Sequence, residues 1–84
     1  LGDVYKRQII DAWFEEEDGL VLVDYKTDRV KEGGEPILLD RYRIQLLYYA
    51  KALAQITGKK VKEAVIYSLA LQKEIPVPID YDKT

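Results

Sequence analysis

The sequence feature that most constrains the fold is a short aliphatic run that passes directly into alternating charges. Residues 20–28 read Leu-Val-Leu-Val-Asp-Tyr-Lys-Thr-Asp and follow Gly19. A short, branched run opened by a glycine is typical of a buried β-strand. Because strand side chains alternate between faces, we expect Asp24, Lys26 and Asp28 to share one face. Charges at the end of a buried strand are costly to desolvate, so this stretch indicates either a functional site or a strand-end ion pair.

Composition limits the chemistry that the chain can perform. The 84 residues are 48% hydrophobic and 33% charged, as in one small soluble domain. The net charge is −2, from 13 basic and 15 acidic residues, so DNA binding would need a local basic patch or metal ions. The chain has no Cys and no His, which excludes thiolate and imidazole chemistry and leaves oxygen ligands for a hard cation. No long apolar segment is present, and we expect a cytoplasmic protein without membrane contact.

A β-hairpin is predicted on either side of Asp18–Gly19, with residues 9–14 as its first strand. In a hairpin, the numbers of two residues that face each other across the strands always add up to the same value, and facing residues share one face of the sheet. A two-residue loop at Asp18–Gly19 sets Asp11 opposite Lys26, and a four-residue loop sets Asp11 opposite Asp24. An odd-numbered loop would move Asp11 to the other face. We expect an even-numbered loop, which brings these three charged residues together.

A long helix is predicted from residue 40 to residue 57, after a polar, glycine-containing connection at residues 29–36. Asp40 is the expected N-cap, and Gly58 is the expected residue after the last turn. A rotation of 100° per residue gathers the apolar side chains into one stripe. The stripe consists of Tyr42, Leu46, Tyr49, Leu53 and Ile56, widened by Leu47, Ala50 and Ala54.

Further expectations concern the third strand and single side chains. A third strand is expected within residues 61–71, best at residues 64–70, where the side chains alternate between two faces. Asp28 is expected to act near the site or to form an ion pair with Arg29. Trp13 and Phe14 are expected to pack against other side chains rather than to stack on bases.

Two carboxylates and a lysine on adjacent strands suit a divalent metal ion. Mg²⁺ prefers oxygen ligands and usually takes one or two carboxylates, with waters and phosphate in the other positions. Asp24 would be a direct ligand, Asp11 a second, and the backbone carbonyl of Tyr25 a third; Mn²⁺ is a possible substitute. Lys26 would hold a water molecule and stabilise charge on a phosphate. The reaction that this arrangement suits is phosphodiester hydrolysis.

The same residues carry a resemblance to a known family. Ile-Ile-Asp at residues 9–11, Asp-Tyr-Lys-Thr-Asp at residues 24–28 and Gln-Leu-Leu-Tyr-Tyr at residues 45–49 resemble the PD-(D/E)XK nuclease superfamily. Over residues 9–75 the chain more narrowly resembles the C-terminal nuclease domain of bacterial helicase–nucleases of the AddAB/RecBCD type, with AddA as the nearest match. The resemblance implies an α/β fold with a restriction-endonuclease-like core in the order β-β-α-β, truncated at the N-terminus.

The resemblance also implies a function and residue roles. It makes Asp11 and Asp24 the metal ligands, Lys26 the catalytic lysine, and Gln45 and Tyr49 a helix pair that contacts DNA or orients catalytic groups. Without it, Gln45 and Tyr49 are an ordinary boundary glutamine and a core aromatic. The implied activity is a Mg²⁺-dependent exonuclease acting on unwound DNA at double-strand ends in recombinational repair, with a helicase–nuclease partner subunit. The alternatives are a non-catalytic DNA-binding or scaffolding module and a Cas4-like exonuclease, which the absence of Cys disfavours.

The expected organisation is that of a fragment. Residues 1–8 are expected to be a non-native or disordered lead, residues 9–75 a partial nuclease domain, and residues 76–84 an extended tail. Two prolines restrict residues 74–79 to an edge strand or an unpaired tail. The family usually has a helix before the first strand that completes the metal site, and a glycine where Gln8 stands.

Overall fold

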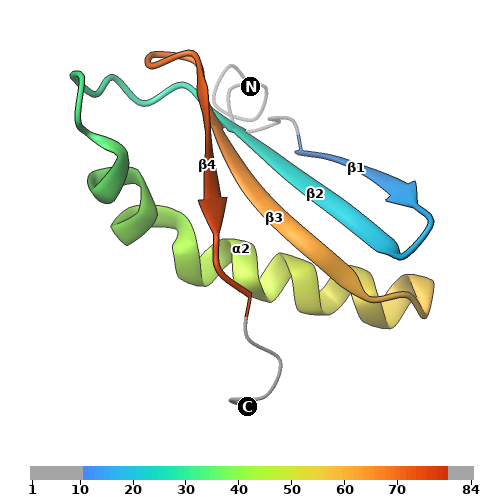
Figure 1. The fold of residues 1–84 in the computed structure, drawn as a ribbon. Coiled ribbons are helices and arrows are strands. Elements are labelled where there is room, and N and C mark those ends of the chain that lie inside the picture. Colours follow the sequence, from blue (N-terminus) through green and yellow to red (C-terminus); the bar gives the residue numbers. More distant parts are fainter. Residues whose placement is uncertain (1–10, 80–84) are drawn as a thin grey trace, which may run out of the picture.

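A computed structural model describes residues 11–79, and over this range one four-stranded mixed sheet carries one long helix on one face (Figure 1). The predicted lead at residues 1–8, the start of the first strand at residues 9 and 10, and residues 80–84 of the tail lie outside the described residues. Within residues 11–79, no helix combines the length and apolarity needed to cross a membrane. The elements are β1 (Asp11–Glu16), β2 (Gly19–Lys26), α2 (Glu35–Thr57), β3 (Val61–Ser68) and β4 (Lys73–Val77).

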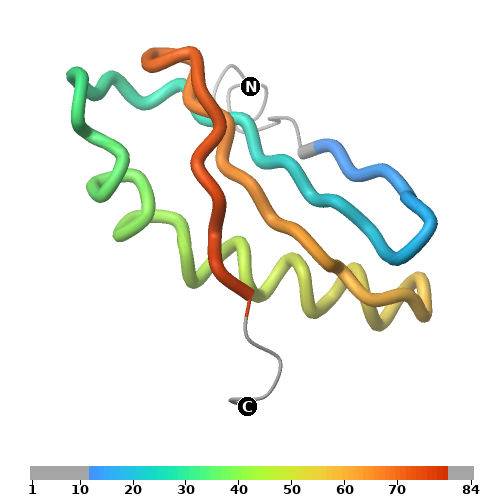
Figure 2. Tube along the Cα trace, viewed as in Figure 1, coloured from blue at the N-terminus to red at the C-terminus, as the bar shows by residue number. Residues whose placement is uncertain are grey.

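The sheet has the order β1-β2-β3-β4, so β2 and β3 are its interior strands. β1 pairs with β2 and β4 pairs with β3 in the antiparallel sense, whereas β2 and β3 are parallel. Parallel neighbours need a long crossover connection, and α2 supplies it. Figure 2 shows the chain leaving the sheet at the end of β2, descending through α2 and returning at the start of β3. Both neighbours of β2 are strands, which explains its continuous aliphatic run.

The β1–β2 hairpin has the even-numbered loop that the sequence predicts. The turn consists of Glu17 and Asp18, one residue earlier than the predicted two-residue loop. The register sets Asp11 opposite Asp24, which is the pairing expected for the four-residue loop. Gly19 follows with φ +152, and a Cβ built on it would lie 2.9 Å from the carbonyl oxygen of Lys60. Glycine is required there because the backbone of the α2–β3 connection approaches too closely for a side chain.

The helix begins five residues before the predicted N-cap. Pro36 lies in the first turn of α2, where its missing N–H costs no helical hydrogen bond, and Gly34 rather than Asp40 is the N-cap. The proline therefore starts the helix instead of belonging to the connection. The predicted end is confirmed: Gly58 is left-handed, with φ 71, and its N–H donates to the carbonyl of Ala54.

The core lies between α2 and the sheet, mainly over β3 and β4. Its buried members are Leu38, Leu46 and Ala50 of α2 and Leu20, Leu22, Val61, Ala64, Ile66, Ile75 and Val77 of the strands. The predicted stripe is wrong at two positions, because Tyr49 is 42% exposed and Ile56 is 82% exposed. The buried helix residues are Leu38, Leu46 and Ala50, so contact with the sheet, rather than the angle around the helix, decides which residues of the stripe are buried.

The second half of the sheet differs from the prediction in its boundaries. β3 spans Val61–Ser68, which lies within the predicted range of residues 61–71 but begins and ends before the segment at residues 64–70 that was expected to fit best. Residues 74–79 are mostly strand β4, which is the edge-strand alternative, so the predicted β-β-α-β order gains a fourth strand. Trp13 and Phe14 are half exposed on edge strand β1, contrary to the packing expected of them, because the helix contacts β3 and β4 and leaves β1 uncovered.

The early helix start can be tested with two neighbouring residues. Leu38 is fully buried, whereas Ile37 is half exposed. Leu38→Ala is expected to lower the free energy of unfolding by about 2–5 kcal/mol, because it removes buried methyl groups and leaves a cavity. Ile37→Ala is the matched control and should cost much less. Urea unfolding measures both values, and equal losses would contradict a helix that starts at Glu35.

Candidate active site

The carboxyl end of β2 places a charged pair at the margin of the core. Leu20, Leu22 and Asp24 stand at every second position of β2 and therefore share one face of the strand. The two leucines belong to the hydrophobic core. The Asp24 side chain is 2% exposed and that of Lys26 is 17% exposed, with Lys26 Nζ 3.4 Å from Asp24 Oδ2. The predicted shared face is therefore correct for Asp24 and Lys26, whereas β2 ends before Asp28. Burial strengthens the attraction between the two charges but makes each of them costly to leave alone.

The register brings a third predicted residue to the same place. Asp11 is the Cα partner of Asp24 across β1 and β2 and so lies on the same face of the sheet. Tyr25 points to the other face, where its ring lies 5.7 Å from that of Tyr67 on β3. Among the side chains that the structure describes, which do not include that of Asp11, no group of three carboxylates could hold a metal ion. One or two carboxylates with a backbone oxygen is nevertheless a donor set that suits Mg²⁺.

Two residues of α2 reach over to the end of β2. The Lys26 ammonium lies 4.2 Å from the centroid of the Tyr42 ring, a cation–π contact. The Tyr42 hydroxyl donates a 2.6 Å hydrogen bond to Asp28 Oδ2. Arg41 Nη1 donates to the same oxygen at 2.8 Å. The predicted ion pair of Asp28 with Arg29 is wrong, because the first turns of the helix supply Arg41 instead.

Sequence reasoning missed Tyr42 as a site residue. It placed Tyr42 in the apolar stripe, and the ring is indeed half-buried against the core. The signal that could have found it is its position one turn before Leu46, on the helix face directed at the strand that carries the charges. Gln45 and Tyr49 are exposed on α2, whereas the contacts with Lys26 and Asp28 come from Tyr42 and Arg41. The structure does not test the role predicted for Gln45 and Tyr49.

The electrostatics of this corner keep Tyr42 neutral and Asp28 charged. Burial, together with the hydrogen bond to Asp28, raises the pKa of Tyr42 to about 12. Burial also acts to raise the pKa of Asp28, but the hydrogen bonds from Tyr42 and Arg41 outweigh it and hold that pKa below its usual value. The hydroxyl therefore remains a donor and the carboxylate an acceptor across the neutral pH range.

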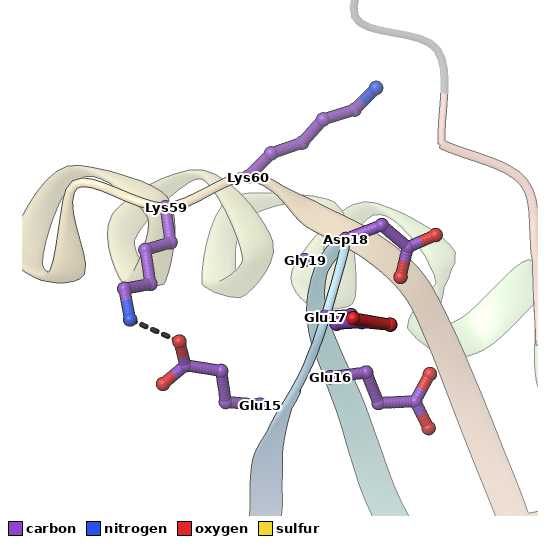
Figure 3. Close-up of a pocket in the computed structure, with 7 residues that line it drawn as sticks. All are labelled: Glu15, Glu16, Glu17, Asp18, Gly19, Lys59 and Lys60. Atoms are coloured by element: carbon purple, nitrogen blue, oxygen red, sulfur yellow. Dashed lines mark hydrogen bonds and ion pairs between the residues drawn. The ribbon is translucent and has the colours of Figure 1, made fainter.

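A pocket of about 330 Å³ lies at the other end of β2, between the hairpin turn and the α2–β3 connection (Figure 3). Residues 15–19, Lys59 and Lys60 line it, and Lys59 forms an ion pair with Glu15. Lys62, beside the pocket, forms ion pairs with Glu16 at 2.5 Å and with Asp18 at 2.6 Å. In these exposed ion pairs, lysines from the α2–β3 connection and the start of β3 bind carboxylates of the β1–β2 hairpin. Such pairs stabilise a fold only slightly.

A second pocket, of about 340 Å³, lies beside the Asp28–Arg41 contact. Residues 29–34, Ile37 and Arg41 line it. Three of the lining side chains, Arg29, Lys31 and Arg41, are cationic, and one, Glu32, is anionic. Arg41 is paired with Asp28, so Arg29 and Lys31 are the cationic side chains that this pocket adds beside the Asp28–Arg41 contact.

Fold and site together define a mixed α/β domain with a carboxylate–lysine pair at the carboxyl end of an interior strand. No family model matches the chain. It is 59% identical over 69 residues to an ATP-dependent helicase/nuclease subunit of Lachnoclostridium phytofermentans, 49% over 69 residues to that of Clostridium novyi, and 63% over 59 residues to that of Thermoanaerobacter pseudethanolicus. These matches cover 82%, 82% and 70% of this chain but only 5%, 6% and 5% of the relatives. The chain thus resembles a small part of helicase/nuclease subunits, in agreement with the resemblance expected from its motifs.

High pH is expected to weaken the fold through Tyr42. A tyrosine in the unfolded chain loses its proton near pH 10, whereas the folded pKa of Tyr42 is about 12. The stabilisation is therefore complete below pH 10 and is lost as the pH rises toward 12. Melting temperatures of wild type and Tyr42→Phe across this range measure the effect, and the wild type should fall more steeply.

The control for this prediction is Asp28→Asn, which removes the neighbouring charge while the ring stays in place. Ultraviolet titration should show the pKa of Tyr42 moving down toward 10 in this variant, because the carboxylate is one of its causes. Parallel melting curves for wild type and Tyr42→Phe, or an unchanged titration in Asp28→Asn, would contradict the hydrogen bond.

Proposed function

We propose that this chain is part of a PD-(D/E)XK-type nuclease domain, with a restriction-endonuclease-like core, in an AddA-type helicase–nuclease. Its activity is Mg²⁺-dependent hydrolysis of DNA phosphodiester bonds. The observation that carries the proposal is the Asp24–Lys26 pair at the carboxyl end of β2, with Asp11 opposite Asp24 in the register. The name of the relatives, which describes them as helicase/nuclease subunits, supports it.

The mechanism assigns distinct tasks to the residues at the end of β2. Asp24 and Asp11 would hold Mg²⁺ by their carboxylates, and Tyr25 by its backbone carbonyl. The metal, when bound, would supply positive charge at the phosphate and make a water molecule more acidic. Lys26 holds the attacking water and stabilises the negative charge that develops on the phosphate. Its shielding from bulk water makes that stabilisation stronger than it would be in solution.

DNA is the proposed substrate because cationic side chains line the pocket beside Asp28, which stands two residues after Lys26 in the chain. Arg29 and Lys31 line the pocket beside Asp28 and would contact phosphates of a bound strand. Gln45 and Tyr49, exposed on α2, are proposed to contact DNA or to orient the catalytic groups. We propose exonuclease action on unwound strands at double-strand ends in recombinational repair, in the cytoplasm. A partner protein is part of the proposal, since the relatives are named as one subunit of a helicase/nuclease.

Metal binding tests the site directly. Calorimetric titration of this chain with Mn²⁺ or Mg²⁺ should show saturable binding, and Asp24→Asn should abolish it, because the amide keeps the shape but loses the negative charge. Asp40→Asn, an equal change on the exposed side of α2, is the matched control and should bind as the wild type does. Binding that survives in Asp24→Asn would contradict the metal site. No binding by the wild type would favour the non-catalytic DNA-binding or scaffolding module.

Cleavage tests the role of Lys26. In the full-length protein, Lys26→Met should lower the rate of DNA cleavage by on the order of 100- to 1,000-fold, because one charge that stabilises the transition state is lost. The variant should also melt at a lower temperature than wild type without metal, since Lys26 neighbours a buried carboxylate. Lys51→Met, on the exposed side of α2, is the control. A full cleavage rate in a folded Lys26→Met protein would refute the assignment.

A further inference from the structure

The ammonium of Lys26 lies against the ring of a tyrosine from another element of the fold. A lysine side chain has four rotatable bonds, so its ammonium is held in one place only by its neighbours. The structure supplies two: Asp24 Oδ2 at 3.4 Å and the Tyr42 ring at 4.2 Å. The carboxylate of Asp24 is also the proposed metal ligand. The attraction of the ring does not depend on whether that carboxylate has another cation to bind.

Tyr42 is itself fixed at its far end. Its hydroxyl donates to Asp28 Oδ2, and Arg41 donates to the same oxygen. Asp28 stands two residues after Lys26, and Arg41 is the neighbour of Tyr42 on α2. Tyr42 therefore contacts the β2 end of the chain twice, at Lys26 through its ring and at Asp28 through its hydroxyl. The second contact fixes the position of the ring over Lys26.

The hydrogen bond to Asp28 also acts on the electrons of the ring. A phenol that donates to a carboxylate carries more electron density in its ring than a phenol that donates to water. The face of such a ring attracts an ammonium more strongly. Asp28 thus both holds the Tyr42 ring and strengthens its attraction for Lys26.

From this geometry we propose that Tyr42 is a positioning residue, anchored by Asp28 and Arg41, that holds the Lys26 ammonium at the reaction centre. The inference rests on the proposed function, since the task of Lys26 is defined there. The competing explanation is that Tyr42 only fills space beside the core, which its half-buried ring also does. The two explanations differ in one respect: only an aromatic ring can attract the Lys26 ammonium, whereas an aliphatic side chain can fill the same space.

Three variants separate these explanations. Tyr42→Phe keeps the ring and loses the hydroxyl, whereas Tyr42→Leu keeps apolar volume and loses the ring. Tyr48→Leu, on the exposed side of the same helix, is the matched control. Should Tyr42→Leu fail to fold, Asp28→Asn takes its place, because it removes the anchor and leaves the ring.

The first measurement is the nuclear magnetic resonance spectrum of Lys26 in the metal-free 84-residue chain. Protons above an aromatic face resonate at higher field, so the ε-methylene protons of Lys26 should be displaced upfield in wild type and Tyr48→Leu. They should return to the ordinary lysine position in Tyr42→Leu and move only part of the way in Tyr42→Phe and Asp28→Asn, because both variants keep the ring and lose its anchor. Resonances in Tyr42→Leu that match those of wild type would overturn the proposal, whatever the activity of the protein.

The second measurement is DNA cleavage by the full-length protein with Mg²⁺. Tyr42→Leu should lower kcat by on the order of 10- to 100-fold, the effect of a small misplacement of a catalytic group, and leave KM unchanged. Tyr42→Phe should recover most of this loss. Equal losses in both variants, or none in either, would overturn the positioning role.

The two measurements also separate this inference from the proposed function. A wild-type protein that binds no metal and cuts no DNA would refute the proposed function, and the Lys26 resonances would still decide whether Tyr42 holds that side chain. A protein that cuts DNA equally well as wild type and as Tyr42→Leu would keep the proposed function and refute the inference.

Discussion

The parallel pairing of β2 with β3 is the constraint on which the rest of the structure depends. Parallel neighbours cannot be joined by a tight turn, so the chain must leave the sheet at the end of β2 and cross back through α2. The crossover places the first turns of the helix beside the strand end that carries Lys26. Arg41 and Tyr42 meet Asp28 there because of topology, since 13 and 14 residues separate them along the chain.

The sequence predicted the features that depend on neighbouring residues. The aliphatic run before Asp24, the even-numbered hairpin loop and the left-handed Gly58 all follow from local periodicity and turn chemistry, and each was found as expected. The start of the helix was not, because Pro36 is equally consistent with a connection and with a first helical turn. Local sequence does not distinguish these two environments.

The features that depend on helix packing were not predictable in the same way. A rotation of 100° per residue allows several overlapping stripes on α2, and only contact with the sheet decides that Leu46 is buried while Tyr49 is not. The same limit hid the role of Tyr42, since an aromatic residue on an apolar stripe reads as core. The charges of Asp24 and Lys26 could be found because polar residues at the end of a buried run are unexpected there.

The burial of Asp24 has a consequence for the energetics of the whole domain. A carboxylate that is 2% exposed opposes folding unless positive charge compensates it, and in the metal-free chain Lys26 lies 3.4 Å from it. Any cation that binds the folded form alone then adds to its stability, by about 1.4 kcal/mol for each tenfold rise in free ligand above the dissociation constant. For the proposed metal site, folding and metal occupancy would in this way be linked equilibria, and the melting temperature of the domain would report how much metal is bound.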